Sequence, residues 1–148
     1  MGRAILAVIV SYVVMFLLFF GGFTCAYLIL GADQAFKPGS YQVSNRWLAL
    51  SFALHIVVGL IGGFLCAAIA KGGKAPLALA IVAVIIGLLL GIPAIMAQRN
   101  LPSTPRTRNV PNLEAMQKVR QPVWAPIALP IVAAVGILIG GKLKRREG

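Results

Sequence analysis

Four long stretches without a charged residue constrain the fold of this chain more than any other feature. All fourteen Lys and Arg residues and all three Asp and Glu residues lie outside them, in tails or loops. At about 1.5 Å per helical residue, each stretch reaches across the roughly 30 Å hydrocarbon core of a bilayer, although the last only just spans it. The stretches cover residues 4–30, 47–70, 75–97 and 123–141.

In lipid, backbone groups can pair only within helices or within a closed barrel. Uninterrupted apolar runs of this length lack the alternation of apolar and polar residues that barrel strands show, so they predict helices. With 59% hydrophobic residues, 148 residues could not cover their apolar surface as a soluble domain. We therefore predict an all-α integral membrane protein, with four transmembrane helices in a compact bundle. The longest remaining piece, 98–122, is too short for an independent fold, so residues 1–148 are expected to form one domain.

The 98–122 loop is basic and contains several prolines. After them, Asn112 is placed to cap a short helix that runs to about Gln121, within which Glu114 and Lys118 are spaced to pair at i, i+4. The apolar residues of this segment share a helical spacing that lets them lie on the membrane, so we expect an interfacial helix. They are Leu113, Met116 and Val119.

The formal net charge of +11 suggests an anionic partner. Because the charges stand next to membrane ends in short segments, we expect contact with anionic lipid headgroups and no nucleic acid. The predicted headgroup contacts are Arg106, Arg108, Lys118, Arg120, Lys142, Lys144, Arg145 and Arg146.

Basic residues are balanced between the two sides of the membrane, so the positive-inside rule separates the orientations weakly. The cluster 142–146 directly after the last stretch and the short hairpin with Lys71 and Lys74 favour both termini in the cytoplasm. The first apolar stretch is too long for a signal peptide, so we expect it to be retained as a span.

Small residues recur at four-residue spacing in three of the stretches. Such stripes let helices approach closely in lipid, where hydrophobicity alone drives little association. They either hold the four helices of one chain together or leave one face for another subunit or a second copy. The stripe positions are Gly59, Gly63, Ala67, Ala83, Gly87, Gly91, Gly136 and Gly140. Pro93, Pro126 and Pro130 predict bends in the third and fourth stretches.

Trp47 and Trp124 are expected to anchor the chain at one membrane interface. Each precedes a glycine by twelve residues, Gly59 and Gly136, which either marks a duplicated helical hairpin or reflects the shared interface alone.

His55 is the one titratable group inside a stretch, apart from the tyrosines and from Cys25 and Cys66, for which we expect a filler role rather than a disulfide. An ionisable residue in a membrane span is a functional candidate, here as a haem ligand, a proton relay or a hydrogen-bonding group. A single histidine cannot complete a metal site, so we expect no metal and no resident cofactor.

Catalytic constellations are missing from the sequence. The acids Asp33, Glu114 and Glu147 are scattered, and no paired carboxylates, phosphate loop or metal spacing occurs. We therefore expect no enzyme. The favoured function is a small accessory or structural subunit in a larger membrane assembly, and the alternatives are a homo-oligomeric transporter or channel and a haem-binding subunit that uses His55.

Overall fold

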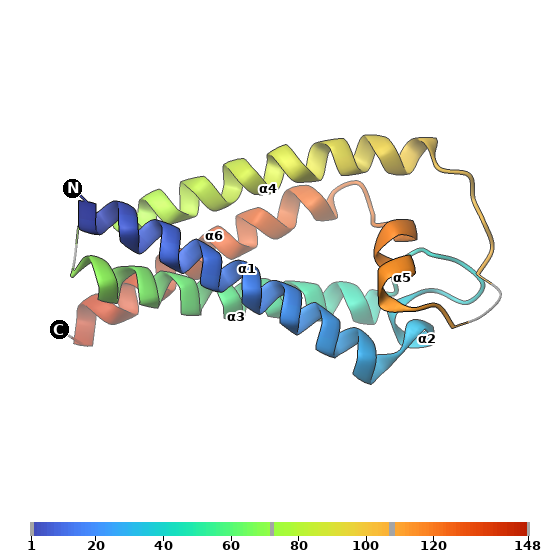
Figure 1. Ribbon diagram of the computed structural model, residues 1–148, viewed down its shortest axis with the longest axis horizontal. Coiled ribbons are helices and arrows are strands. Elements are labelled where there is room, and N and C mark those ends of the chain that lie inside the picture. The colour runs from blue at the N-terminus through green and yellow to red at the C-terminus, as the bar shows by residue number, and fades with distance from the viewer. Residues whose placement is uncertain (1, 72, 107–108, 148) are drawn as a thin grey trace.

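The computed structural model describes residues 2–71, 73–106 and 109–147 (Figure 1). Its regular structure is helical, and four of its helices are long and apolar enough to cross a membrane. They are α1 (Gly2–Leu30), α3 (Asn45–Ala70), α4 (Ala75–Asn100) and α6 (Ala125–Glu147). Two short helices, α2 (Ala32–Ala35) and α5 (Asn112–Lys118), lie in the loops between them.

The prediction of four apolar helices of membrane length is confirmed, with shifted ends. Helix α3 begins before Trp47 because the Ser44 side chain caps it, accepting a 3.1 Å hydrogen bond from the Trp47 backbone N–H. Helix α6 begins at Ala125, after a turn in which the Pro122 carbonyl accepts from the Ala125 N–H, and it continues past residue 141. Its last turn holds Lys144, Arg145 and Arg146, where cations interact favourably with the helix dipole.

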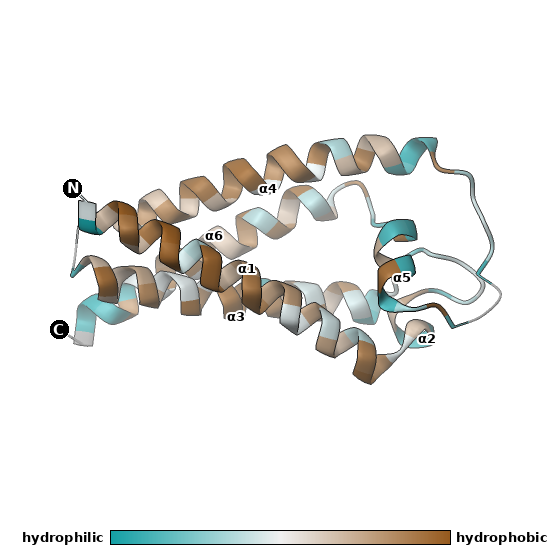
Figure 2. Cartoon of the chain, viewed as in Figure 1, coloured by the Kyte–Doolittle hydropathy of each residue, from teal (hydrophilic) through white to brown (hydrophobic). Residues whose placement is uncertain are grey.

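The helices run back and forth, so both termini and the turn between α3 and α4 lie at one end of the molecule, called here the terminal end (Figure 1). The opposite end, the loop end, holds α2, α5 and the loops 31–44 and 101–124. Hydropathy follows this division, with apolar helix surface between polar residues at both ends (Figure 2). Large side chains such as Ile29 and Leu90 are 83% and 70% exposed, which suits a lipid environment.

Helices α3 and α6 form the most extensive contact and run in the same direction. Their glycines permit this approach, because a Cβ added to Gly59 would lie 2.5 Å from the Ala133 carbonyl oxygen and one added to Gly136 would lie 2.9 Å from that of Ile56. Helix α4 packs mainly against α6, and α1 packs mainly against α3. The buried residues between them include Leu79, Ile137, Val58 and Cys66.

At the loop end, the first and third loops pair through their backbones. The Val43 N–H donates to the Arg120 carbonyl at 3.0 Å, and the Arg120 N–H donates to the Tyr41 carbonyl at 2.9 Å. Phe36 and Val43 form a further bridge within the first loop. This pairing and α2 were not among the predicted features.

The pairing also explains why the predicted helix of the third loop has different ends. Helix α5 stops at Lys118 rather than Gln121, because Val119 and Arg120 turn into extended backbone that bonds the first loop. The capping role predicted for Asn112 is wrong: Pro111 is the N-cap residue, and the Asn112 amide donates to the Thr24 hydroxyl at 3.4 Å instead. Val119 packs against a buried hydrophobic cluster that includes Tyr27, Phe36 and Tyr41.

Candidate functional site

An aromatic cavity of about 330 Å³ opens near the loop end, between α1, α3 and α5. Its volume falls at the lower end of the roughly 300–1,000 Å³ typical of small-molecule sites. The lining is mostly aromatic and aliphatic, with a few amide and hydroxyl groups. It consists of Phe16, Phe19, Phe20, Phe23, Thr24, Tyr27, Ala35, Phe36, Trp47, Asn112, Ala115, Met116, Val119 and Gln121.

Helix α1 supplies the aromatic wall of this cavity. Its aromatic residues follow the spacing i, i+3, i+4, i+7 and i+11, which places them along one helical face. The Phe23 ring lies 5.8 Å from the Trp47 ring of α3, and the Tyr27 ring lies 6.2 Å from it in an edge-on arrangement, as centroid distances. This site was not predicted from the sequence, although the spacing of the aromatic residues is a signal that could have indicated it: Phe16, Phe19, Phe20, Phe23 and Tyr27.

Helix α5 covers one side of the cavity and is tied to α1. The buried Tyr27 hydroxyl donates a 2.6 Å hydrogen bond to the Val110 carbonyl, two residues before the helix begins. Within α5, Ala115 is 3% exposed and packs against the cluster that contains Tyr27 and Phe36. The polar lining groups, which include Thr24, Asn112 and Gln121, come from α1 and the third loop, so the cavity offers apolar surface with a few polar groups.

His55 lies deeper along α3, beside the aromatic cavity rather than in it. Its Nδ1 is 2.7 Å from the Ser51 carbonyl on the same helix, and its ring is 4.5 Å from that of Phe19 as centroids. It lines a separate cavity of about 130 Å³ whose other walls include Tyr12, Gly87 and Pro130. This volume is well below that of a typical cofactor site.

The small-residue positions of the sequence analysis lie at contacts between helices of this chain. An added Cβ at Gly63 would meet the Ile137 carbonyl, and one at Gly140 would meet the Leu60 carbonyl. On α4, Gly87 and Gly91 face Pro130 and Pro126 of α6, with added-Cβ distances of 2.5 Å and 3.0 Å to their nearest atoms. Ala67 is buried, and Ala83 is partly buried against the same core.

The two tryptophans predicted to anchor the chain at one membrane interface both lie at the loop end. Trp47 lines the aromatic cavity, whereas Trp124 is 52% exposed and stacks on Phe52 with a centroid distance of 5.9 Å.

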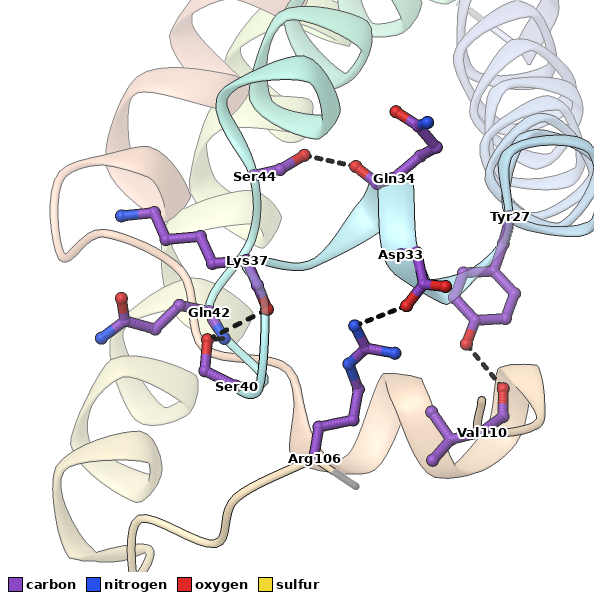
Figure 3. Close-up of polar contacts among 9 residues, drawn as sticks. All are labelled: Tyr27, Asp33, Gln34, Lys37, Ser40, Gln42, Ser44, Arg106 and Val110. Atoms are coloured by element: carbon purple, nitrogen blue, oxygen red, sulfur yellow. Dashed lines mark hydrogen bonds and ion pairs between the residues drawn. The ribbon is translucent and has the colours of Figure 1, made fainter. Parts of the chain in front are cut away.

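Two of the basic residues predicted to contact headgroups pair with acids. Arg106 lies 2.8 Å from Asp33, with its side chain only 6% exposed, and the Tyr27–Val110 bond lies beside this pair (Figure 3). Lys118 lies 2.9 Å from Glu114, and this hydrogen bond raises the pKa of Lys118.

The other predicted headgroup contacts lie at both ends. Arg120 donates to the Leu101 carbonyl, and Arg108 falls outside the described residues. At the terminal end, Arg145 donates to the Gly73 carbonyl and the Lys144 amine lies 5.3 Å from the Phe64 ring. Lys142 and Arg146 lie on the same last stretch of α6.

Over the described residues, no group of three or more His, Cys, Asp or Glu side chains is placed to hold a metal ion. The aromatic cavity offers an apolar wall and a few hydrogen-bonding groups to a bound molecule.

The sequence matches no protein-family model, and comparison with curated proteins and with solved structures gives no significant match.

Proposed function

We propose that this protein is a non-catalytic, multi-pass membrane protein that binds the apolar chain of a membrane amphiphile in its aromatic cavity. The observation that carries the proposal is the cavity itself, with its aromatic wall from α1 and its cover from α5. Apolar cavities with a few converging polar groups are the usual form of small-ligand sites.

The position of the aromatic cavity favours a lipid as its ligand over a water-soluble molecule. The cavity is built on two helices that are long and apolar enough to cross a membrane, so a chain could enter it from the bilayer without passing through water. The rings of Phe23, Tyr27 and Trp47 offer flat apolar surface, and the amides of Asn112 and Gln121 offer hydrogen bonds to the polar end of such a molecule.

In this proposal α5 lies at the membrane surface and the four long helices form one bundle. Leu113 is 69% exposed and does not line the aromatic cavity, so α5 has an apolar side chain free to contact headgroups and upper chains. Both termini are assigned to the cytoplasm, on the basis of the basic cluster at the end of α6.

A role as an accessory subunit stays a prediction. The small-residue stripes that suggested it are occupied by contacts within the chain, at the α3–α6 and α4–α6 pairs, so they do not by themselves offer a docking face. A transporter and a haem-binding subunit stay predictions as well. Haem binding by His55 has little support, because the cavity beside His55 is small and the His55 Nδ1 contacts the Ser51 carbonyl of its own helix.

Trp47 provides a direct test, because the chain has two tryptophans and one of them lines the cavity. The variant Trp124→Phe leaves Trp47 as the reporter, and Trp47→Phe leaves the exposed Trp124. Each is titrated in a neutral detergent with phosphatidylcholine that carries brominated acyl chains, which quench indole fluorescence on contact.

We expect quenching of Trp47 to saturate at one lipid per chain, and quenching of Trp124 to follow the lipid fraction of the micelle. Ala115→Phe should abolish the saturable phase by filling the cavity, whereas Ala97→Phe, on the exposed face of α4, should leave it unchanged. Identical, non-saturating quenching of both tryptophans would refute the proposed function.

A further inference from the structure

A second cavity, called here the basic cavity, lies where the first loop, the end of α4 and the start of the last span meet. Its volume is about 370 Å³. Three basic residues line it, one from each of three separate segments: Lys37, Arg99 and Arg120. Three glutamine side chains complete its polar lining: Gln42, Gln98 and Gln121.

The backbone places Arg120 at the edge of this cavity, since its N–H and C=O groups bond Tyr41 and Val43 of the first loop. Its guanidinium donates to the carbonyl of Leu101, which lines a neighbouring cavity of about 230 Å³. Gln98 is likewise held, since its side-chain oxygen accepts a 3.1 Å hydrogen bond from the Gln121 N–H. This leaves the Gln98 amide nitrogen as a donor for a ligand.

No acidic residue lines the basic cavity, and among the described residues the acids at the loop end pair with other cations. Asp33 bonds Arg106, and Glu114 bonds Lys118. Figure 3 shows the side chains of Lys37 and Gln42 extending away from the Asp33–Arg106 pair, on the other side of the first loop. Like charges gathered in one cavity repel each other, so an anion bound there would lower the free energy of the arrangement.

The basic cavity adjoins the aromatic cavity. Gln121 lines both cavities. Val119, which lines the aromatic cavity, is followed directly in the sequence by Arg120, which lines the basic cavity. A molecule with an apolar chain and an anionic head would therefore meet an apolar wall and a cationic pocket next to each other.

We propose that the basic cavity binds a phosphate group through Lys37 and Arg99, with Arg120 adding positive charge at its edge. This phosphate belongs to the headgroup of the lipid whose chain occupies the aromatic cavity, an assignment that rests on the proposed function. Arginine side chains bind phosphate oxygens in a bidentate manner, lysine contributes a point charge, and the glutamine amides can donate to the remaining oxygens.

The test is a competition between two lipids with the same acyl chains. The full chain in neutral detergent receives equal amounts of phosphatidylglycerol and of diacylglycerol, which lacks the phosphate, and native mass spectrometry counts the retained lipid of each kind. We expect the wild type to prefer phosphatidylglycerol, and Lys37→Gln and Arg99→Gln each to lower that preference about fivefold. Arg46→Gln/Lys71→Gln removes as much charge as the double variant Lys37→Gln/Arg99→Gln but lies outside the cavity, so it should keep the wild-type ratio.

A second arm uses inorganic phosphate, which separates a free anion from a headgroup. If lipid preference is absent but phosphate raises the melting temperature of the wild type and not of Lys37→Gln/Arg99→Gln, the cavity binds phosphate that no lipid carries. If both lipids are retained equally and phosphate has no such effect, the basic cavity is not an anion site, while the proposed function stands because a lipid is still bound. Loss of all lipid in the wild type would instead remove the proposed function.

Discussion

At the scale of single residues, the glycines between α3 and α6 decide how closely these two parallel helices pack. An added Cβ at Gly63 would overlap the Ile137 carbonyl, which belongs to backbone and cannot turn aside. We expect Gly63→Ala to lower the free energy of unfolding in detergent by about 1–3 kcal/mol, through overpacking.

Gly21→Ala in α1 is the matched control, because nothing lies within 4 Å of a Cβ added there. Alanine also favours helix over glycine, so this variant should be neutral or slightly more stable. Equal melting temperatures for the two variants would show that the close α3–α6 contact does not exist in the folded protein.

The Lys118–Glu114 pair provides a residue-scale prediction in pH. The hydrogen bond to Glu114 raises the pKa of Lys118 in the folded state, so the stabilisation that it contributes is present below the ordinary lysine pKa and is lost as pH rises through the raised value. Glu114→Gln should lower the pKa of Lys118, measured from the side-chain NMR shifts of this lysine. The pair is exposed to solvent, so global stability should change little. An unchanged titration of Lys118 would mean that the pair does not form.

Among the elements, α5 is tied to α1 by the buried hydrogen bond from Tyr27 to the Val110 carbonyl, in addition to the weaker Asn112–Thr24 contact and the packing of Ala115. Tyr27→Phe leaves that carbonyl without its donor, at a cost of about 1–3 kcal/mol. We expect faster amide hydrogen exchange across residues 110–118 and little change in α3 or α4. Tyr12→Phe removes a hydroxyl from the same helix at a position without a hydrogen bond among the described contacts, and exchange in 110–118 should then match the wild type. Equal protection in both variants would contradict the tie between α1 and α5.

The long helices could be predicted from the sequence because membrane length and lack of charge are local properties, visible in each stretch by itself. The ends moved where local capping or turns decided them, as at Ser44 and Pro122. By contrast, the end of α5 at Lys118 depends on Arg120 pairing with Tyr41, across about half of the chain, and no local pattern encodes that partner. The aromatic cavity was predictable from the sequence only in part. The spacing of aromatic residues on α1 was readable, but its meaning required knowing that α5 folds back over it.

Across the whole molecule, both proposed ligand cavities lie at the loop end, whereas the closest contacts between α3 and α6 lie toward the terminal end. The glycine contacts, from Gly59 to Gly140, hold α3 and α6 together toward the terminal end. At the loop end, aromatic side chains and paired loops surround space instead of filling it. The close α3–α6 contacts fix one of the two helices, α3, on which the proposed binding site is built.

The proposed function requires that one lipid chain occupy the aromatic cavity in the protein as it exists in its membrane. Native mass spectrometry of the full chain, released directly from the membrane in which it was made, tests this most directly. We expect one phosphate-bearing lipid per chain, retained in the wild type and in Ala97→Phe and lost in Ala115→Phe. A wild-type chain that emerges without lipid, whether alone or bound to larger subunits, would contradict it.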